Sequence, residues 1–577
     1  MHSLRSAAAG LAAAAMLSSV QCAAVPAWAD RTAEAGATRA RTVRAGAVKT
    51  RTARAWAPKA RTARAGAARA RTARAGAANA GIAQAGLTEA RPAEAAAVTA
   101  GAVQTRAVQA RTVRTGEACP SDATCGTLVV PLDRTRSAGS TRVAYMLVRR
   151  RDPSRPAEGT IAPNPGGPGV GVIAQRDFYG SRYHDLLATH DLLLVDPRGV
   201  GRSDPLRCPS GGWDDLRGSR AAAVGAVAAC GRELGEVRRY YTSAAAADDI
   251  DDVRAHLGIG KLTLIGQSYG SYLMTVYARR HPRHVRTMVL SSAYPLRFDM
   301  LGRPTARAMR RAVRLLCRRS GGACDGDQVL ADLATVAARL RREPVRYADG
   351  DRVLDETALA STVYKLASGH ADLFGKLPLA LRTAVAGDTG PLVELAEQVR
   401  PISGALAAGP SSMPLFVTMV CNDYPALWDR DDPVRRRART YGARLARLDP
   451  RDYRPFRPRA WIAGIVDLGD LCLAWPGRPA PSPPGAGRLP DVPVLVLSGE
   501  LDTSTPTEEG LLAADQYRDA RVVEVPSTGH VPEKNGRASA CAISIETGFI
   551  RLRRVPDTGC LRHVAPIAVE RVPNALT

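Results

Sequence analysis

A serine, an aspartate and a histidine occur in this order along the chain, each directly after an apolar run: Ser268, Asp502 and His530. A serine hydroxyl is a weak nucleophile and needs a base to take its proton as it attacks. Histidine titrates near neutral pH, so it can take this proton and return it to a leaving group. A carboxylate on the other ring nitrogen fixes the tautomer and stabilises the imidazolium. The three residues together predict a catalytic triad for acyl transfer.

The stretch "KLTLIGQSYGSYL", residues 261 to 273, places Ser268 between two glycines at the junction of a strand and a helix. The G-x-S-x-G pattern is a weak motif by itself, and a plain strand–turn–helix would also use these glycines. Its position after an apolar strand favours a nucleophile elbow. His563 is the reserve base, but it lies near the C-terminus without the strand that precedes His530.

Acyl transfer also needs backbone N–H donors for the negative oxygen of the tetrahedral intermediate. The amide of Tyr269, directly after the serine, is one predicted donor. The second is an amide of Gly166 or Gly167, in the glycine loop "NPGGPG" that follows another apolar strand.

The same region allows a different interpretation. Residues 169 to 174, "GVGVIA", fit the G-x-G-x-x-G/A fingerprint of a dinucleotide site, and Asp196 ends the next strand, where it could bind a ribose. Pyrophosphate binding does not require the Gly-Gly-Pro that comes before. We therefore favour turn geometry, rather than catalysis or cofactor binding, for Asp196 and Arg198.

The elements that must position these residues follow from hydrophobic patterning. From Cys119 onward, apolar strands alternate with helices, which is typical of an α/β fold with a mostly parallel sheet. Between about 298 and 472 the strand signal fades and three segments show helical spacing, at 303–319, 327–342 and 374–387. Sequence patterns typical of strands return at 493–502 and 520–530. We therefore expect core segments at 117–297 and 473–577, with a helical cap at 298–472 inserted over the functional edge of the sheet.

Residues 1–29 have the features of a secretory signal peptide. A weakly positive start precedes a short apolar region, and Ala27-Trp28-Ala29 fits the small-x-small cleavage rule. The sequence therefore predicts a secreted protein. No other segment has 18 uninterrupted apolar residues, so no membrane span is expected after signal removal.

The chain contains 11 cysteines, of which ten remain after loss of Cys22 with the signal. An even number in an exported protein predicts disulfides. Spacing does not fix connectivity, and pairing of sequence neighbours is our hypothesis. The cysteines do not cluster with histidines, which argues against a cysteine-based zinc site. The hypothetical pairs are Cys119/Cys125, Cys208/Cys230, Cys317/Cys324, Cys421/Cys472 and Cys541/Cys560.

Residues 30–116 form an Ala/Arg/Thr-rich segment with a period of ten residues. It holds 17 Lys and Arg against 4 Asp and Glu, about half of the net charge of +25. Such a segment could hold the protein on anionic cell-wall polymer or nucleic acid. It also has almost nothing larger than alanine to bury, and this favours a disordered leader or propeptide.

With these residues in place, the chain resembles the secreted tripeptidyl and prolyl aminopeptidase group of α/β-hydrolases, with a TAP-like C-terminal region. The resemblance rests on "CGTLVVPLD", "NPGGPG", "DPRGVGRSD", "GQSYGSYL", "GELDTSTP", "TGHVP" and "PDTGC", which span residues 119 to 560. It implies an α/β-hydrolase fold with a helical cap. It also implies a nucleophile at Ser268, an acid at Asp502, a base at His530 and an oxyanion hole at the glycine loop.

One departure concerns the substrate. Members of this group usually continue NPGGPG with Gly or Ser, whereas this chain has Val170-Gly171-Val172. The resemblance implies that acidic cap residues hold a free α-ammonium group. Asp423 is a candidate substrate-binding residue, although a solvated or capping role is the simpler interpretation for a lone aspartate.

The sequence thus predicts a secreted, monomeric serine aminopeptidase of tripeptidyl or prolyl type that needs no metal and no organic cofactor and binds no specific nucleic acid. An esterase or amide hydrolase acting on small molecules is the alternative. A third interpretation is an inactive hydrolase-fold protein whose basic repeat binds cell-wall polyanions.

Overall fold

The structure of the 577-residue chain is a computed structural model. The structure describes residues 110–111, 119–209, 219–347, 350, 352–399, 411–482, 485–534 and 536–572. The chain divides into two units, Met1–Ala100 and Gly101–Thr577, and all described residues belong to the second. The predicted signal peptide, and the basic repeat apart from residues 110–111, lie outside the described residues.

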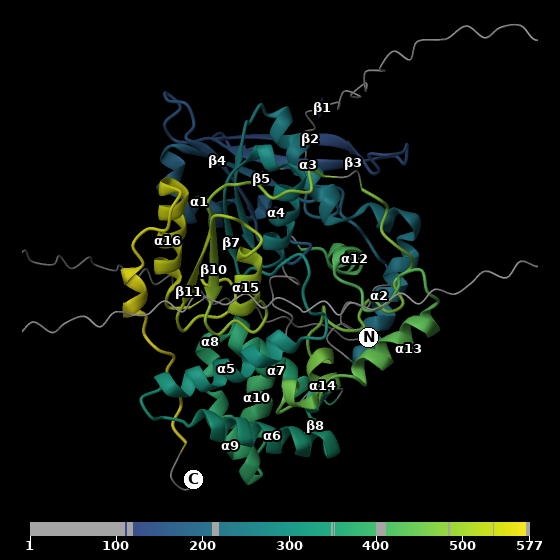
Figure 1. Cartoon of the computed structure of the whole chain (residues 1–577), viewed down its shortest axis with the longest axis vertical. Coiled ribbons are helices and arrows are strands. Elements are labelled where there is room, and N and C mark those ends of the chain that lie inside the picture. The colour runs from purple at the N-terminus through teal and green to yellow at the C-terminus, as the bar shows by residue number, and fades with distance from the viewer. Residues whose placement is uncertain are drawn as a thin grey trace, which may run out of the picture. The chain divides into compact units, whose positions relative to one another are not determined.

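A nine-stranded sheet forms the centre of the part of the chain that the structure describes (Figure 1). Its strand order is β1-β2-β3-β5-β4-β6-β7-β10-β11, with antiparallel pairing from β1 to β5 and parallel pairing from β5 to β11. The strands are β1 (Ala110–Arg111), β2 (Ala123–Pro131), β3 (Ser140–Val148), β4 (Gly159–Asn164), β5 (His190–Val195), β6 (Leu262–Gln267), β7 (Val285–Ser291), β10 (Val494–Gly499) and β11 (Ala520–Val525). A separate hairpin pairs β8 (Val345–Arg346) with β9 (Val353–Leu354).

The central strands are buried on both faces, which explains their continuous apolar runs. Every residue of β5, β6 and β10 is buried. Alternate side chains of β6 enter two different clusters, because successive residues of a strand point to opposite faces. Leu264 packs in one cluster with Leu273, and Ile265 packs in the other with Phe549. Helices therefore cover both faces, as expected for a parallel sheet.

The helices of the core are α1 (Arg176–Arg182), α2 (Arg220–Glu233), α3 (Ser243–His256), α4 (Tyr269–Arg280), α15 (Thr507–Ala514) and α16 (Ser539–Leu552). Short 3-10 helices occur at η1 (Ile173–Gln175), η2 (Leu186–Ala188), η4 (Gly235–Tyr240), η5 (Pro282–His284), η6 (Pro450–Tyr453) and η7 (Gly559–His563).

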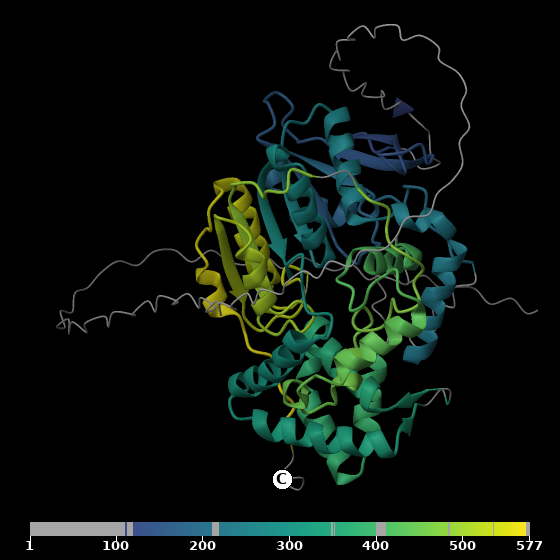
Figure 2. The same cartoon turned by 45° about the vertical axis from the view of Figure 1, so that its right-hand side comes forward.

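A helical insertion lies between β7 and β10, as the sequence predicts. It contains α5 (Arg303–Arg319), α6 (Gly326–Arg342), α7 (Glu356–Gly369), α8 (Ala371–Phe374), α9 (Leu377–Ala386), α10 (Gly390–Val399), α12 (Met413–Asp423), α13 (Val434–Leu445) and α14 (Pro458–Ala463). Figures 1 and 2 show α5 to α10 gathered at one end of the sheet. The cap helices α5, α6 and α9 coincide with three segments in which helical spacing predicts helices.

Five disulfides join sequence neighbours, and their pairing confirms the hypothesis drawn from the cysteine order. The bonds are Cys119–Cys125, Cys208–Cys230, Cys317–Cys324, Cys421–Cys472 and Cys541–Cys560. Among the described residues, no helix is both long and apolar enough to cross a membrane.

The contact between α4 and β4 depends on a glycine. A Cβ atom on Gly270 would lie 2.2 Å from the carbonyl oxygen of Asn164. We expect Gly270→Ala to lower the free energy of unfolding by about 1–3 kcal/mol, because the added methyl group overpacks this contact. Urea unfolding monitored by circular dichroism measures the change.

Gly225→Ala is the matched control, because Gly225 lies exposed in α2 and an added Cβ atom there meets nothing within 4 Å. It should raise stability by about 0.5–1 kcal/mol, since alanine loses less backbone entropy in a helix. Equal effects of the two substitutions would contradict the packing argument.

Candidate active site

Ser268 sits in a sharp turn between β6 and α4. Its backbone has φ 55° and ψ −127°, a sparsely populated conformation for a residue with a side chain. The strand and the helix are in close contact, since a Cβ atom on Gly266 would lie 2.4 Å from the carbonyl oxygen of Gly270. The tight turn places Ser268 beyond the carboxyl end of β6, as in a nucleophile elbow.

Asp502 and His530 follow β10 and β11 at the same edge of the sheet. His530 Nδ1 lies 2.9 Å from Asp502 Oδ2. Asp502 is fully buried, and its Oδ1 accepts hydrogen bonds from the amides of Ser504 (2.8 Å) and Thr505 (3.0 Å). The hydroxyl of Thr505 donates to Asp502 Oδ2 over 2.8 Å. Burial alone would raise the pKa of Asp502, but His530 and these donors outweigh it and hold the pKa below its ordinary value.

The carboxyl end of β7 connects the turn at Ser268 to the histidine loop. The amide of Ser268 donates to the carbonyl oxygen of Ser291 over 3.0 Å. The next hydroxyl, that of Ser292, accepts a hydrogen bond from the amide of Val531 over 2.6 Å. Ser292 and Val531 both have positive φ, 50° and 56°. The turn at Ser268 and the loop at Val531, which both have unusual backbone conformations, are therefore hydrogen-bonded to the carboxyl end of β7.

The cap also holds the histidine loop. The amide of His530 donates to the carbonyl oxygen of Ser368, in the last turn of α7, over 2.5 Å. A Cβ atom on Gly529 would lie 2.1 Å from the same oxygen. The loop that carries His530 thus packs directly against the C-terminal end of a cap helix.

A buried carboxylate, which the sequence analysis missed, lies behind the turn. Glu533 accepts hydrogen bonds from Gln267 Nε2 (2.6 Å) and Ser291 Oγ (2.5 Å), and it pairs with Arg182 at 3.1 Å. Arg182 also pairs with buried Glu546 of α16. Burial alone would raise the pKa of Glu533, but Arg182 and the two donors keep it below its ordinary value of 4.5. The only signal in the sequence is a charged residue three positions after His530.

The glycine loop touches the turn at Ser268. A Cβ atom on Gly166, which has φ +93°, would lie 2.4 Å from the carbonyl oxygen of Gln267 and 3.0 Å from the amide nitrogen of Tyr269. The amide of Gly166 already donates to Asn164 Oδ1 over 3.1 Å. Among the described contacts the amide of Gly167 donates no hydrogen bond, so it is the better placed of the two to bind an oxyanion.

The dinucleotide interpretation is wrong. Asp196 Oδ1 accepts hydrogen bonds from the amides of Val172 (2.6 Å) and Ile173 (2.9 Å), and its Oδ2 accepts one from the amide of Arg202 (2.8 Å). Asp196 therefore holds the segment directly after the glycine loop, and two amides of the proposed fingerprint, those of Val172 and Ile173, are engaged by it. Arg198 is buried in a bidentate pair with Asp249. Both residues are structural.

Asp423 has the capping role that the sequence analysis named as the simpler interpretation. Its Oδ2 accepts hydrogen bonds from the amide and the hydroxyl of Ser243, the first residue of α3, both over 2.6 Å. The hydroxyl of Tyr269 lies 2.6 Å from Ser243 Oγ. Burial raises the pKa of Asp423 to about 6. This carboxylate therefore caps α3 and, through the hydroxyl of Ser243, supports the buried ring of Tyr269.

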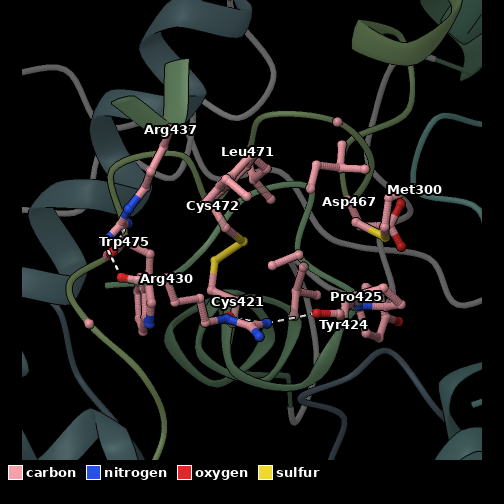
Figure 3. Close-up of a pocket in the computed structure, with 16 residues that line it drawn as sticks. Met300, Cys421, Tyr424, Pro425, Arg430, Arg437, Asp467, Leu471, Cys472 and Trp475 are labelled. Carbon is pink, nitrogen blue, oxygen red and sulfur yellow. Dashed lines mark hydrogen bonds between the residues drawn. A yellow bond between two sulfur atoms is a disulfide. The ribbon is translucent and has the colours of Figure 1, made fainter. Parts of the chain in front are cut away.

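A second cap carboxylate, Asp467, lines a small pocket that also contains Met300, Tyr424 and the Cys421–Cys472 disulfide (Figure 3). The pocket volume of about 20 Å³ is room for roughly one water molecule. Figure 3 shows Asp467 beside Met300, on the side away from the arginines of the pocket.

Asp467 lies within electrostatic range of His530. Burial raises the pKa of Asp467, and a hydrogen bond from its own backbone amide, together with Arg220 and His530, opposes this rise. Asp467 in turn contributes to the raised pKa of Tyr364, whose hydroxyl donates to Ser504 over 2.9 Å, two residues from Asp502. Nothing in the pattern "GIVDLGDLC" distinguishes Asp467 from neighbouring Asp470, so the sequence alone could not select it.

The family model described as alpha/beta hydrolase fold matches residues 164–318, which include the glycine loop and the turn at Ser268. The chain has the α/β-hydrolase fold. A second model, described as TAP-like protein, matches residues 461–560, which contain Asp502 and His530.

This α/β-hydrolase is similar to two groups of curated proteins over most of its length. It is 26% identical to a tripeptidyl aminopeptidase of Streptomyces lividans, over 78% of this chain and 85% of the relative. It is 28% identical to the serine protease Hip1 of Mycobacterium bovis, over 76% of this chain and 87% of the relative. A solved α/β-hydrolase enzyme from a Medee basin deep-sea metagenome library is 12% identical, with a TM-score of 0.32, over 72% of this chain and 97% of that chain.

The buried ion pairs of Glu533 should make a large contribution to stability. We expect Glu533→Gln to lower the free energy of unfolding by about 3 kcal/mol or more, because it leaves Arg182 buried with one partner fewer. Since the pKa of Glu533 lies below 4.5 in the folded protein, its contribution is full above that pH. It is lost as the pH falls through the folded-state pKa. Urea unfolding at several pH values measures both effects.

Glu508→Gln is the matched control. Glu508 pairs with Arg311 at the surface, and half of its side chain is exposed, so the change should stay within about 1 kcal/mol. A Glu533→Gln protein as stable as this control at neutral pH would show that the buried network is dispensable.

Proposed function

We propose that this α/β-hydrolase is a serine hydrolase in which Ser268 is the nucleophile, His530 the general base and Asp502 the residue that orients it. The observation that carries this proposal is the 2.9 Å contact between His530 Nδ1 and buried Asp502, at the sheet edge where Ser268 stands in a strained turn. Loops beyond the carboxyl ends of parallel strands are where ligands bind in such sheets.

In the proposed reaction, Ser268 Oγ attacks the carbonyl carbon of the substrate while His530 Nε2 takes the hydroxyl proton. Nε2 is the ring nitrogen available for this step because Nδ1 faces Asp502. The amides of Tyr269 and Gly167 would stabilise the oxyanion. Collapse of the intermediate gives the proton to the leaving group and forms an acyl-enzyme, which water hydrolyses by the same steps. The negative end of α7, at Ser368, favours the positive charge that forms on His530.

We propose peptides with a free N-terminus as the substrate class. Two relatives that cover most of the chain are named tripeptidyl aminopeptidase and serine protease, and the chain is 26% and 28% identical to them. An exopeptidase of this kind needs an anionic group to hold the substrate ammonium. Asp467 is our candidate, because it is a half-buried carboxylate on the cap within electrostatic range of His530. Tyr424 beside it would add an aromatic face, which also attracts cations.

We also propose that the protein is exported, as the signal-like segment 1–29 predicts. Five disulfides in one chain are typical of proteins that fold in an oxidising compartment. Binding of anionic cell-wall polymer by residues 30–116 is a separate proposal that rests on their charge alone.

The proposed reaction is tested with matched substrates: peptide amides with a free N-terminus, their N-acetylated forms and simple esters. We expect hydrolysis of the free-amine peptides, and a loss of kcat on the order of 10⁴-fold or more in Ser268→Ala, because the nucleophile is removed. Turnover of esters alone would keep the triad and assign an esterase. If wild type and Ser268→Ala had equal rates on every substrate, the proposed nucleophile would be wrong.

Replacing the proposed ammonium-binding residue should change substrate preference. We expect Asp467→Asn to lower kcat/KM for free-amine peptides by about 30-fold or more, as for a buried charge pair that contributes about 2 kcal/mol. N-acetylated peptides and esters should be affected little. Asp470→Asn is the control, because Asp470 lies three residues away and pairs with Arg220 at 2.8 Å. A uniform loss on all substrates would assign Asp467 to the structure of the cap instead.

A further inference from the structure

A cluster of two histidines and an aspartate lies at the opposite edge of the sheet from Ser268. Asp251 belongs to α3, and His281 and His284 border and end the 3-10 turn η5 that leads into β7. One ligand atom from each of the three residues lies within 4.8 Å of the others. The seven residues of β7, about 20 Å of strand, separate this cluster from the end at Ser291.

The local backbone brings the two imidazoles to one side. Residues three apart in a 3-10 helix eclipse one another, and the sequence His-Pro-Arg-His places histidines at this spacing. Their rings stack with centroids 6.0 Å apart and an angle of 8° between planes. Both present Nδ1 to Asp251, His281 at 3.4 Å from Oδ2 and His284 at 2.7 Å from Oδ1.

These distances suit a metal ion. Zinc binds histidine nitrogen and carboxylate oxygen at about 2.0–2.2 Å, so neighbouring ligand atoms of a tetrahedral site lie roughly 3.3 Å apart. The separation of His281 Nδ1 from Asp251 Oδ2 is 3.4 Å. Small rotations of His284 and of the carboxylate would bring the third ligand to the same spacing.

A second observation points to metal rather than to an ordinary surface cluster. His281 Nε2 lies 2.8 Å from Asp248 Oδ1, so this carboxylate contacts the ring nitrogen that does not face Asp251. Histidine ligands of metals usually donate their other N–H to a carboxylate in this way.

The surroundings orient the carboxylates and leave access for solvent. Arg254 Nε (2.7 Å) and the hydroxyl of Tyr277 (2.8 Å) donate to Asp251 Oδ1, and Arg280 Nε (2.7 Å) donates to Asp248. The side chains of His281 and His284 are 21% and 34% exposed. Three protein ligands with an accessible side leave a fourth position for water.

We propose that Asp251, His281 and His284 bind a borderline divalent transition metal, with zinc the first choice, and that Asp248 orients His281. Nitrogen and oxygen ligands of this kind select zinc and its neighbours over calcium or magnesium. The metal would tie the end of α3 to the turn before β7 and so stabilise the core. It takes no part in the proposed hydrolysis, and the cysteines, which form disulfides, contribute no ligand.

Titration of tag-free, chelator-treated protein with Co²⁺ tests the site without any assay of hydrolysis. We expect one equivalent of Co²⁺ to produce visible absorption of a low-coordinate site, and Zn²⁺ to displace it. Zn²⁺ should also raise the melting temperature, because it binds the folded protein preferentially. His281→Ala and His284→Ala should abolish both effects, and Asp248→Asn should weaken binding by about 10- to 100-fold.

His184→Ala is the matched control, because His184 is an exposed histidine that contacts Asp185 at 3.2 Å outside the cluster. It should bind Co²⁺ like the wild type. The wild-type titration decides the proposal even if a cluster variant fails to fold. Absence of the visible band in wild type, or an equal band in the protein with both His281→Ala and His284→Ala, would overturn it.

Discussion

The geometry of the active site depends on one buried carboxylate. Glu533 is hydrogen-bonded to Gln267, which precedes the proposed nucleophile Ser268, and to Ser291 at the end of β7, and it pairs with Arg182 of α1. It lies three residues after His530 in the chain. A single side chain therefore connects the strand that carries Ser268 to the loop that carries His530, the proposed base. Because the carboxylate is fully buried, its interactions are strong and its loss is costly.

Unusual backbone conformations collect around this carboxylate. Ser268, Ser292 and Val531 all have positive φ although none is glycine. Each such conformation costs of order 1–3 kcal/mol and persists only where the surroundings hold it. Here the surroundings are the hydrogen bonds to the end of β7 and the close glycine contacts of the turn. The buried central strands of the sheet thus stabilise these unfavourable backbone conformations.

The sequence predicts those helices and strands whose apolar residues recur with the period of a helix or a strand. The apolar runs of β5, β6 and β10 and the helical spacing of α5 and α6 are local patterns, and each was found where expected. Asp502 and His530 could be placed because each follows such a strand. The cysteine pairs could be placed because they are neighbours in the chain.

What the sequence could not reveal depends on packing between distant segments. Glu533 and Arg182 are 351 positions apart, and no periodicity marks either one. Asp423 and Asp467 both belong to the helical insertion. Only the fold shows that Asp423 accepts hydrogen bonds at the N-terminus of α3, whereas Asp467 lines a pocket. The amide of Gly166 could be assigned only when Asn164 was seen to accept its hydrogen bond.

The bond from His530 to α7 has a consequence for the evolution of the cap. The carbonyl oxygen of Ser368 receives the amide of His530 and lies against Gly529. The helical insertion therefore contributes a backbone contact to the candidate active site and cannot be exchanged independently of it. A chimera that exchanged this insertion for that of a relative would have to place a carbonyl oxygen where that of Ser368 lies, or His530, the proposed base, would lose this backbone hydrogen bond.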